Sequence, residues 1–246
     1  TMCLALCVAA SAVAARSNVA ARSNAIAARS NTTAVRAALQ RVTDRMQSKY
    51  DMSIAAAFVS ADASVTVAAG FTDRGLGMGN ASRRARADDE YVWGSTTKMF
   101  TASAVLQLVD AGVVRLSDPA SKHVDPALRR LNGTTLRGHF GAWIERVTIE
   151  HLLHMTSGIA DYDGTAYADA QGLAPGRGDR TRDFDPGSIV LQFVAREADF
   201  EPGSRQRYCS TNYILLGLAL LTHQHGPAAD WSWPSYDQRS VVAGCE

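Results

Sequence analysis

Residues 93–101 read Trp-Gly-Ser-Thr-Thr-Lys-Met-Phe-Thr, which places Ser95 three positions before Lys98. Positions i and i+3 of a helix lie on one face, close enough for a serine hydroxyl to pass its proton to a lysine amine. Serine is a weak nucleophile without such a base, and lysine serves as the base when its surroundings favour the neutral amine. If one helix carries both residues, this stretch predicts a covalent serine nucleophile. A solvent-facing lysine early in a helix is the alternative interpretation.

The residues after this stretch favour a helix. Apolar residues follow at helical spacing: Phe100, Ala104, Val105, Leu108 and Val109. Gly112 then marks a helix end, and residues 116–119, Leu-Ser-Asp-Pro, indicate a turn. Ser95 would lie at the start of a largely apolar, buried helix, whose N-terminus stabilises negative charge on the serine oxygen.

The segment before residue 93 predicts one helix and one hairpin. An amphipathic helix is expected from Thr33 to Lys49. Its apolar face would comprise Val35, Leu39, Val42 and Met46. Residues 53–59 and 64–70 are strand-like runs joined by a short polar turn, so they predict an antiparallel hairpin.

Four blocks of the chain, taken in order, resemble the serine β-lactamase and penicillin-binding protein family. They are residues 93–101, residues 106–112 (Leu-Gln-Leu-Val-Asp-Ala-Gly), residues 148–158 (Thr-Ile-Glu-His-Leu-Leu-His-Met-Thr-Ser-Gly) and residues 200–213. The third block is similar to the family signature Leu-Leu-x-His-Thr-Ser-Gly, and the fourth to the segment that carries the family's Tyr-x-Asn motif. The likeness covers about residues 86–222 and is greatest to the class C β-lactamase-like, esterase and D-peptidase branch.

Carried over position by position, the resemblance implies roles for particular residues. Ser95 corresponds to the acylated nucleophile, Lys98 to its proton acceptor, and Tyr208 to the phenol that passes protons to the leaving group. Ser210 holds the third position of the Tyr-x-Asn motif, where the family most often has asparagine. A serine there would bind substrate or Lys98 through one hydrogen bond, without the two-ended reach of an amide. The resemblance implies neither a metal nor an organic cofactor.

The sequence departs from the family near its end. Family members complete the site with a Lys-Thr-Gly or His-x-Gly strand that supplies an oxyanion-hole N–H, and no such motif is present here. Residues 223–226, His-Gln-His-Gly, follow too closely on the preceding helix to be that strand. The implied fold is α+β and β-lactamase-like, with an antiparallel sheet flanked by helices. A helical domain would cover about residues 95–222, crossed by Gly- and Asp-rich loops at 160–187. The whole domain would span residues 33–246, with the C-terminal part of its sheet missing.

The N-terminal residues predict a targeting segment and a linker. Residues 1–15 are apolar and small, which is typical of a signal peptide, and they are too short to span a bilayer. An Ala-rich helix is the alternative. Copies of Ala-Arg-Ser-Asn begin at positions 15, 21 and 28, so residues 16–32 are expected to be a disordered low-complexity linker. A signal peptide would make the protein secreted or extracytoplasmic.

Secretion would give meaning to two other features. Asn31, Asn80 and Asn132 each begin an Asn-x-Ser/Thr glycosylation acceptor. Cys209 and Cys245 would remain after removal of the leader and would meet an oxidising compartment. Two cysteines in so large a chain make no disulfide scaffold, and Cys209 is predicted to be a buried free thiol.

Several other functions have little support in the sequence. The net charge is +1 and the arginines are spread along the chain, which argues against nucleic-acid binding. His151 and His154 lack the carboxylate ligands of a known zinc pattern, so no metal site is predicted. The Gly-x-Ser-x-Gly elbow of α/β-hydrolases is absent around Ser95. No segment has the length and hydrophobicity of a membrane span.

The leading hypothesis is a serine hydrolase that cleaves an amide or ester through an acyl-enzyme on Ser95. Its partner would be a small-molecule or peptide substrate, namely a β-lactam, a D-amino-acid peptide or a carboxylic ester. The alternative is an inactive or truncated relative that binds muropeptide-like or protein ligands. A third hypothesis, supported by composition, is a structural or adhesion protein that uses the Arg-Ser-Asn tract.

Overall fold

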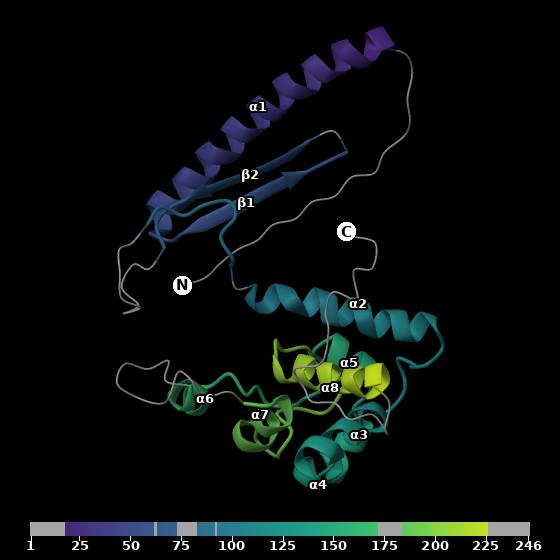
Figure 1. Ribbon diagram of the computed structural model, residues 1–246. Coiled ribbons are helices and arrows are strands. Elements are labelled where there is room, and N and C mark those ends of the chain that lie inside the picture. Colours follow the sequence, from purple (N-terminus) through teal and green to yellow (C-terminus); the bar gives the residue numbers. More distant parts are fainter. Residues whose placement is uncertain (1–17, 62, 73–82, 92, 172–183, 226–246) are drawn as a thin grey trace. The chain divides into compact units, whose positions relative to one another are not determined.

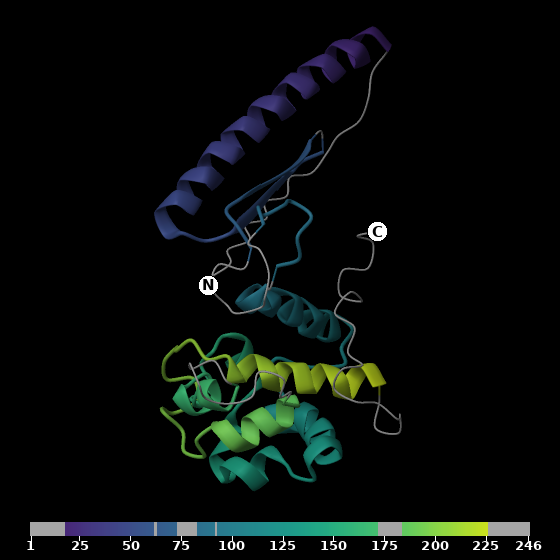
Figure 2. The same ribbon diagram turned by 60° about the vertical axis from the view of Figure 1, so that its left-hand side comes forward.

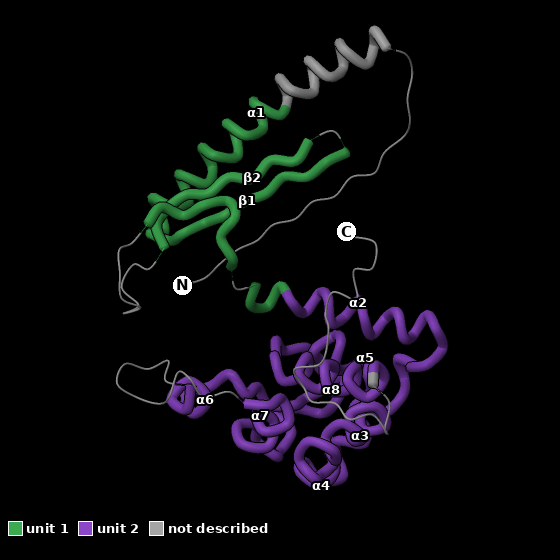
Figure 3. Tube along the Cα trace, viewed as in Figure 1, with its two compact units in different colours: residues 1–96 green, residues 97–246 purple. Residues whose placement is uncertain are grey.

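The chain divides into two units, residues 1–96 and residues 97–246 (Figure 3). The computed structural model describes residues 18–61, 63–72, 83–91, 93–171 and 184–225. The predicted signal peptide, Asn80 and Cys245 lie outside these residues. The described part of unit 1 holds one long helix and a hairpin, and that of unit 2 is helical (Figure 1).

Unit 1 packs its helix along the β-hairpin (Figure 1). Helix α1 spans Asn18–Tyr50, strand β1 spans Ile54–Val59 and strand β2 spans Ser64–Ala69. The two strands pair antiparallel, with Ile54 opposite Ala69. Both lie within one residue of their predicted bounds, so the predicted hairpin is confirmed.

Polar side chains of α1 cover the outer edge of β2. The Arg36 guanidinium donates to the carbonyl of Thr66 at 2.8 Å, and the Gln40 amide donates to the carbonyl of Ala68 at 3.0 Å. Alternate carbonyls of an edge strand point away from its partner strand and need donors from elsewhere. Helix α1 therefore satisfies groups on β2 that the two-stranded pairing leaves open.

The apolar face of α1 is narrower than the sequence predicts. Val35 and Leu39 are half-buried, whereas Val42 is 57% exposed and Met46 is 37% exposed. The most buried side chain on this part of the helix is Thr43, at 3% exposure. Val42 and Met46 are exposed in the described residues because α1 meets β2 through a stripe that includes polar side chains.

The start of α1 also differs from the prediction. The helix begins at Asn18, so residues 18–32 are helical where their composition predicts a disordered segment. Alanine has the highest helix propensity of all residues and arginine is close to it, which accounts for the difference. The role of residues 16–32 as a linker stays a prediction.

Unit 2 begins with α2, which spans Thr97–Asp110. Its predicted end at Gly112 is confirmed, since this residue has a φ of +72° and its N–H donates to the carbonyl of Val109. The helices that follow are α3 (Ala120–Asn132), α4 (Leu136–Phe140), α5 (Ile149–Leu153), α6 (Thr165–Ala170), α7 (Pro186–Phe193) and α8 (Thr211–His225). The 3₁₀ helix η1 (Gly94–Thr96) ends unit 1, and the 3₁₀ helix η2 (Ala142–Arg146) lies in unit 2. Helix α6 lies inside the stretch 160–187 that the sequence predicts as loops.

Helix α8 lies at the centre of unit 2, between α2 on one side and α3 and α7 on the other (Figures 1 and 2). It is apolar on most of its circumference, and Leu215, Leu216 and Leu218 are fully buried. Val124 and Leu128, one turn apart on α3, are fully buried as well. Burial of each such side chain contributes roughly 1.5–3 kcal/mol, so this core fixes α8 in the unit. No helix in the described ranges is both long enough and apolar enough to cross a bilayer.

Two details of the helices bear on the site. His223 and Gln224 belong to α8, so they do not form the family's third-motif strand, as predicted. Helix α2 is less buried than expected, because Ala104 and Val105 are its buried residues while Met99 is 60% exposed. It packs against α8, with Leu108 and Val109 partly buried against the core.

Candidate active site

Lys98 lies in the first turn of α2, beside the loop that enters α8. Its amine donates a hydrogen bond to the hydroxyl of Ser210 at 3.3 Å. The same amine lies 5.0 Å from the ring centroid of Tyr208 and 5.8 Å from that of Tyr213. Lys98 and Ser210 are 112 residues apart in sequence, and the fold brings them into contact together with Tyr208. The catalytic roles of these residues stay predictions.

Ser95 lies in η1, directly before α2. Gly94 has a φ of +53°, a conformation that residues with a Cβ rarely adopt, and it turns the chain into η1. Ser95 is exposed, and it does not share an α-helix with Lys98 as the spacing predicts, because the first turn is a 3₁₀ helix. The chain itself still keeps the two Cα atoms within about 11 Å, since only three Cα–Cα steps separate them.

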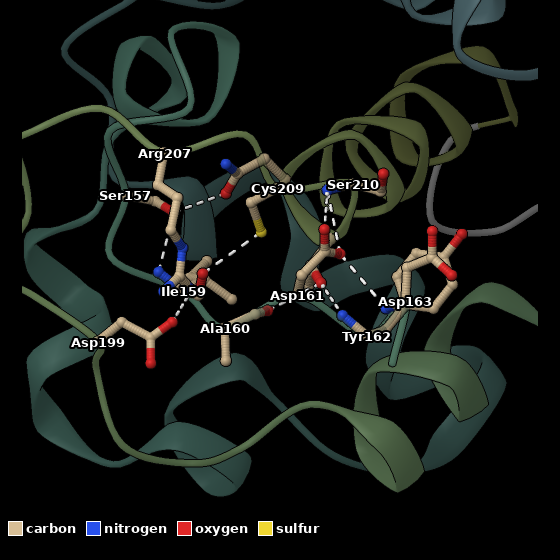
Figure 4. Close-up of polar contacts among 12 residues, drawn as sticks. Ser157, Ile159, Ala160, Asp161, Tyr162, Asp163, Asp199, Arg207, Cys209 and Ser210 are labelled. Atoms are coloured by element: carbon tan, nitrogen blue, oxygen red, sulfur yellow. Dashed lines mark hydrogen bonds and ion pairs between the residues drawn. The ribbon is translucent and has the colours of Figure 1, made fainter. Parts of the chain in front are cut away.

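A strap made of residues 157–162 holds the loop that carries Tyr208 and Ser210 (Figure 4). Both carboxylate oxygens of Asp161 accept from the backbone N–H of Ser210, each at 3.1 Å. The hydroxyl of Thr211 accepts from the backbone N–H of Tyr162 at 3.0 Å and donates to the carbonyl of Ala160 at 2.9 Å. The strap therefore sets the position of Ser210, the hydrogen-bond partner of Lys98.

A second group of contacts lies deeper in the strap. The hydroxyl of Ser157 donates to the side-chain oxygen of Asn212 at 2.6 Å and accepts from the N–H of Ile159 at 3.1 Å. The thiol of Cys209 donates to the carbonyl of Ile159 at 3.3 Å. Burial raises the pKa of the Cys209 thiol, so it stays a protonated donor. The prediction of a buried free thiol at Cys209 is confirmed.

The Thr-Ser-Gly end of the signature block forms a tight turn under this loop. Gly158 has a φ of +79°, and its carbonyl accepts from the N–H of Asp199 at 2.8 Å. A Cβ on Gly158 would overlap the carbonyl oxygen of Phe200. The carbonyl of Thr156 accepts from the N–H of Gly203 at 2.8 Å. Only a glycine allows the two segments to approach this closely, which gives the signature a physical reason.

Sequence reasoning missed Asp161 and assigned no role to Ser157. Both act on residues about fifty positions away in sequence, so neither has a local pattern that reveals its partner. The available signal was position, because Asp161 lies three residues after Gly158 and opens the Asp-rich stretch.

A pocket of about 290 Å³ lies in unit 2 between α2 and α8. Lys98 and Ser210 line it, together with Thr97 and Thr101 from α2 and the ring of Tyr213. Its size lies at the lower end of the range for small-molecule sites, which suits part of a ligand.

The tyrosines beside the pocket are neutral. Burial, together with the nearby Tyr167 and acidic residues, raises the pKa of Tyr162 to about 12. Burial, and to a lesser extent Tyr208, raises the pKa of Tyr213, whose hydroxyl donates to the carbonyl of Leu153 at 3.2 Å. Tyr162 and Tyr213 therefore keep their protons at neutral pH and bring no negative charge near Lys98.

The imidazole of His151 in the signature block caps the helix that carries it. The Nδ1 atom of His151 accepts from the backbone N–H of Thr148, the N-cap of α5, and the Thr148 hydroxyl accepts from the N–H of His151. Within the part of the chain that the structure describes, no three His, Cys, Asp or Glu side chains are placed to hold a metal ion.

Comparisons with curated sequences give relatives that match more than half of the chain. Protein flp of Staphylococcus aureus (strain N315) is 30% identical over 152 residues, which are 61% of this chain and 27% of that protein. Penicillin-binding protein 4 of Amycolatopsis lactamdurans is 32% identical over 188 residues, which are 74% of this chain and 42% of that protein. The chain therefore spans less than half the length of these relatives.

Solved structures and a family comparison agree with these relatives. A D-stereospecific amidohydrolase from Streptomyces sp. matches 73% of this chain and 44% of its own, with 26% identity and a TM-score of 0.51. The D-amino acid amidase from Ochrobactrum anthropi SV3 has 20% identity and a TM-score of 0.53 over 77% of this chain and 46% of its own, a likeness of fold. The family described as Beta-lactamase matches residues 38–226, which include Ser95, Lys98, Tyr208 and Ser210. By the extent of that match, the chain belongs to the beta-lactamase family.

Proposed function

We propose that this protein is a serine hydrolase that opens an amide or ester bond through an acyl-enzyme on Ser95. The observation that carries the proposal is the 3.3 Å hydrogen bond between Lys98 and Ser210, beside the ring of Tyr208. Lys98 lies three residues after Ser95, in the first turn of α2. In this proposal the Lys98 amine exchanges protons with Ser95, three residues earlier in the chain, and with the phenol of Tyr208.

In the first half-reaction, the Ser95 oxygen attacks the carbonyl carbon of the substrate and its proton passes to the amine of Lys98. The backbone N–H of Ser95 supplies one donor to the negative carbonyl oxygen. The bond from the carbonyl carbon to the leaving nitrogen or oxygen then breaks as Tyr208 passes a proton to the leaving group. Tyr208 takes a proton back from the Lys98 amine, so the proton lost by Ser95 ends on the leaving group. Water attacks the acyl-enzyme in the second half-reaction, which releases the acid and restores Ser95.

The names of the relatives support an amide substrate. One is a penicillin-binding protein and another is a D-stereospecific amidohydrolase, so the substrate class would include β-lactams and amides of D-amino acids. Carboxylic esters stay in the proposed class, because the same acyl chemistry opens them. We also propose secretion, which the apolar residues 1–15 support.

The test is covalent labelling of Ser95. The purified chain is incubated with a fluorophosphonate probe and, separately, with benzylpenicillin, and adducts are located by intact mass and peptide mapping. We expect an adduct on Ser95, none in Ser95→Ala, and a labelling rate at least tenfold lower in Lys98→Ala. Absence of an adduct from a folded chain would overturn the proposal and favour a non-catalytic relative that binds its ligand.

A further inference from the structure

A row of residues on one face of α8 lines the 290 Å³ pocket beside Lys98. Ser210, Ile214, Gly217 and Leu221 are spaced by four, three and four positions, so they follow one face of the helix and its entry. At 1.5 Å per residue, this row extends about 16 Å from the Lys98–Ser210 hydrogen bond. The pocket thus continues from the proposed catalytic amine along a mostly apolar wall.

The middle of that wall is open because residue 217 is glycine. Among the described residues, a Cβ added to Gly217 meets no atom within 4 Å, so none of them fills the space above it. Glycine destabilises the interior of a helix relative to alanine, and here alanine would fit without a clash. Helix α8 is otherwise rich in leucine, whereas Gly217 has no side chain to pack at this position of the pocket wall.

The other walls are uncharged apart from Lys98. Tyr162 and Pro186 line the pocket from the loop side, and Thr97 and Thr101 line it from α2. Tyr213 directs its hydroxyl to the carbonyl of Leu153. Among the described residues that line the pocket, Lys98 alone carries a charged side chain. Hydrocarbon and ring surfaces of this kind bind uncharged apolar groups.

We propose that the pocket between α2 and α8 binds an uncharged aromatic or branched aliphatic side group of the substrate. The inference rests on the proposed hydrolase function for the position of the scissile carbonyl, near Ser95 and Lys98. The enzyme would select substrates that carry such a group over those with a methyl group or hydrogen in its place. Gly217 would be the residue that sets the size limit.

Binding is tested without turnover, on the full chain carrying Ser95→Ala. The probes are 3-phenylpropanamide and, as the small counterpart, acetamide, and dissociation constants are measured by NMR titration. We expect 3-phenylpropanamide to bind at least tenfold more tightly than acetamide. Adding Gly217→Leu should fill the pocket and raise the dissociation constant of 3-phenylpropanamide at least tenfold. Gly217→Ala should raise it by a smaller factor.

Ser103→Leu is the matched control, because Ser103 is on α2, is exposed and does not line the pocket. It adds the same leucine side chain and should leave binding unchanged. Should Gly217→Leu fail to fold, the Gly217→Ala comparison decides the question. Equal affinity for the two amides, or equal affinity in the Gly217 variants, would overturn the proposal.

The outcome is separable from that of the proposed function. If Ser95 is labelled by the fluorophosphonate but the affinity for 3-phenylpropanamide is the same in all Gly217 variants, the hydrolase proposal stands and the pocket proposal fails. Gly217-dependent binding without labelling would retain the pocket as a ligand site and reject the hydrolase.

Discussion

The imidazole of His123 on α3 meets the imidazole of His223 on α8 across an Nδ1···Nε2 distance of 2.9 Å. The Nε2 atom of His123 lies 2.8 Å from a carboxylate oxygen of Asp118, which also accepts from the Lys122 amine at 2.9 Å. Both ring nitrogens of His123 are therefore engaged. A proton shared with Asp118 leaves the other nitrogen of His123 to accept from a neutral His223.

This relationship predicts a loss of stability in mild acid. Burial lowers the pKa of His223 in the folded chain, and the nearby His123 and Lys122 act in the same direction. The unfolded chain takes up that proton at an ordinary histidine pKa near 6.5, so it binds more protons than the folded chain just below that pH. Stability should be fully present above about pH 6.5 and should fall as the pH drops below it. Melting temperatures from pH 7.5 to 5 measure this.

A histidine elsewhere in unit 2 serves as the comparison for that experiment. Burial also lowers the pKa of His139, so His223→Gln and His139→Gln should each remove part of the pH dependence. Asp118 affects stability in a different pH range. Hydrogen bonds from Lys122 and His123 lower its pKa, so its contribution to the free energy of unfolding is lost only in stronger acid. If His223→Gln leaves the change in melting temperature between pH 5 and pH 6.5 as it is in the unmodified chain, the His123–His223 contact does not cause the pH dependence.

Asp161 is expected to act as a positioning residue for Ser210. Asp161→Ala removes both acceptors of the Ser210 N–H and should cost about 1–3 kcal/mol of unfolding free energy. It should also slow fluorophosphonate labelling of Ser95, since Ser210 is the partner of Lys98. Asp161→Asn keeps one acceptor and should restore part of the rate. Asp163→Ala, an exposed neighbour with the same charge change, is the control and should behave as the unmodified chain.

Ser157 should be worth more to stability than its size indicates. Ser157→Ala would leave the side-chain oxygen of Asn212 and the N–H of Ile159 without their partner in a buried place. The amide nitrogen of Asn212 already lacks a hydrogen-bond partner among the described residues. A cost of about 1–3 kcal/mol is expected in denaturant unfolding. The exposed Ser103→Ala should change stability by less than about 0.5 kcal/mol, and equal effects would contradict the assignment.

The sequence predicts well those features that depend on short-range patterns. The hairpin, the end of α2 at Gly112 and the burial of Cys209 depend on alternation, backbone conformation and polarity, which act within a few residues. The hydrogen bonds between Asp161 and Ser210 and the exposure of Val42 depend on which distant segments pack together. No local sequence pattern encodes this packing. The placement of Ser95 in a 3₁₀ turn rather than in α2 depends on the positive φ of Gly94, which the residue type permits without requiring it.

Asn132 should carry no glycan in the folded protein, although it begins an acceptor tripeptide. Its amide nitrogen, the atom that a glycan would modify, donates to Asp185 at 3.2 Å and to Ser188 at 3.4 Å, across the contact between α3 and α7. Expression in a glycosylating host, followed by peptide mapping of folded protein, should find Asn132 unmodified. A glycan there at high occupancy would show that α7 does not pack on Asn132 in solution.

Gly158 and Gly112 allow backbone strain to be separated from steric overlap. Both have a positive φ, +79° and +72°. A Cβ on Gly158 would overlap the carbonyl of Phe200, whereas one on Gly112 meets no atom of the described residues within 4 Å. Gly112→Ala should therefore cost about 1–2 kcal/mol, the strain of the left-handed conformation alone. Gly158→Ala adds the overlap and should cost more than about 4 kcal/mol, enough to displace the turn beneath the Tyr208 loop. Denaturant unfolding of the two variants, with Ser95 labelling as the second readout, tests this. Similar losses in both variants would mean that the turn at Gly158 can move away from Phe200 without disturbing the site.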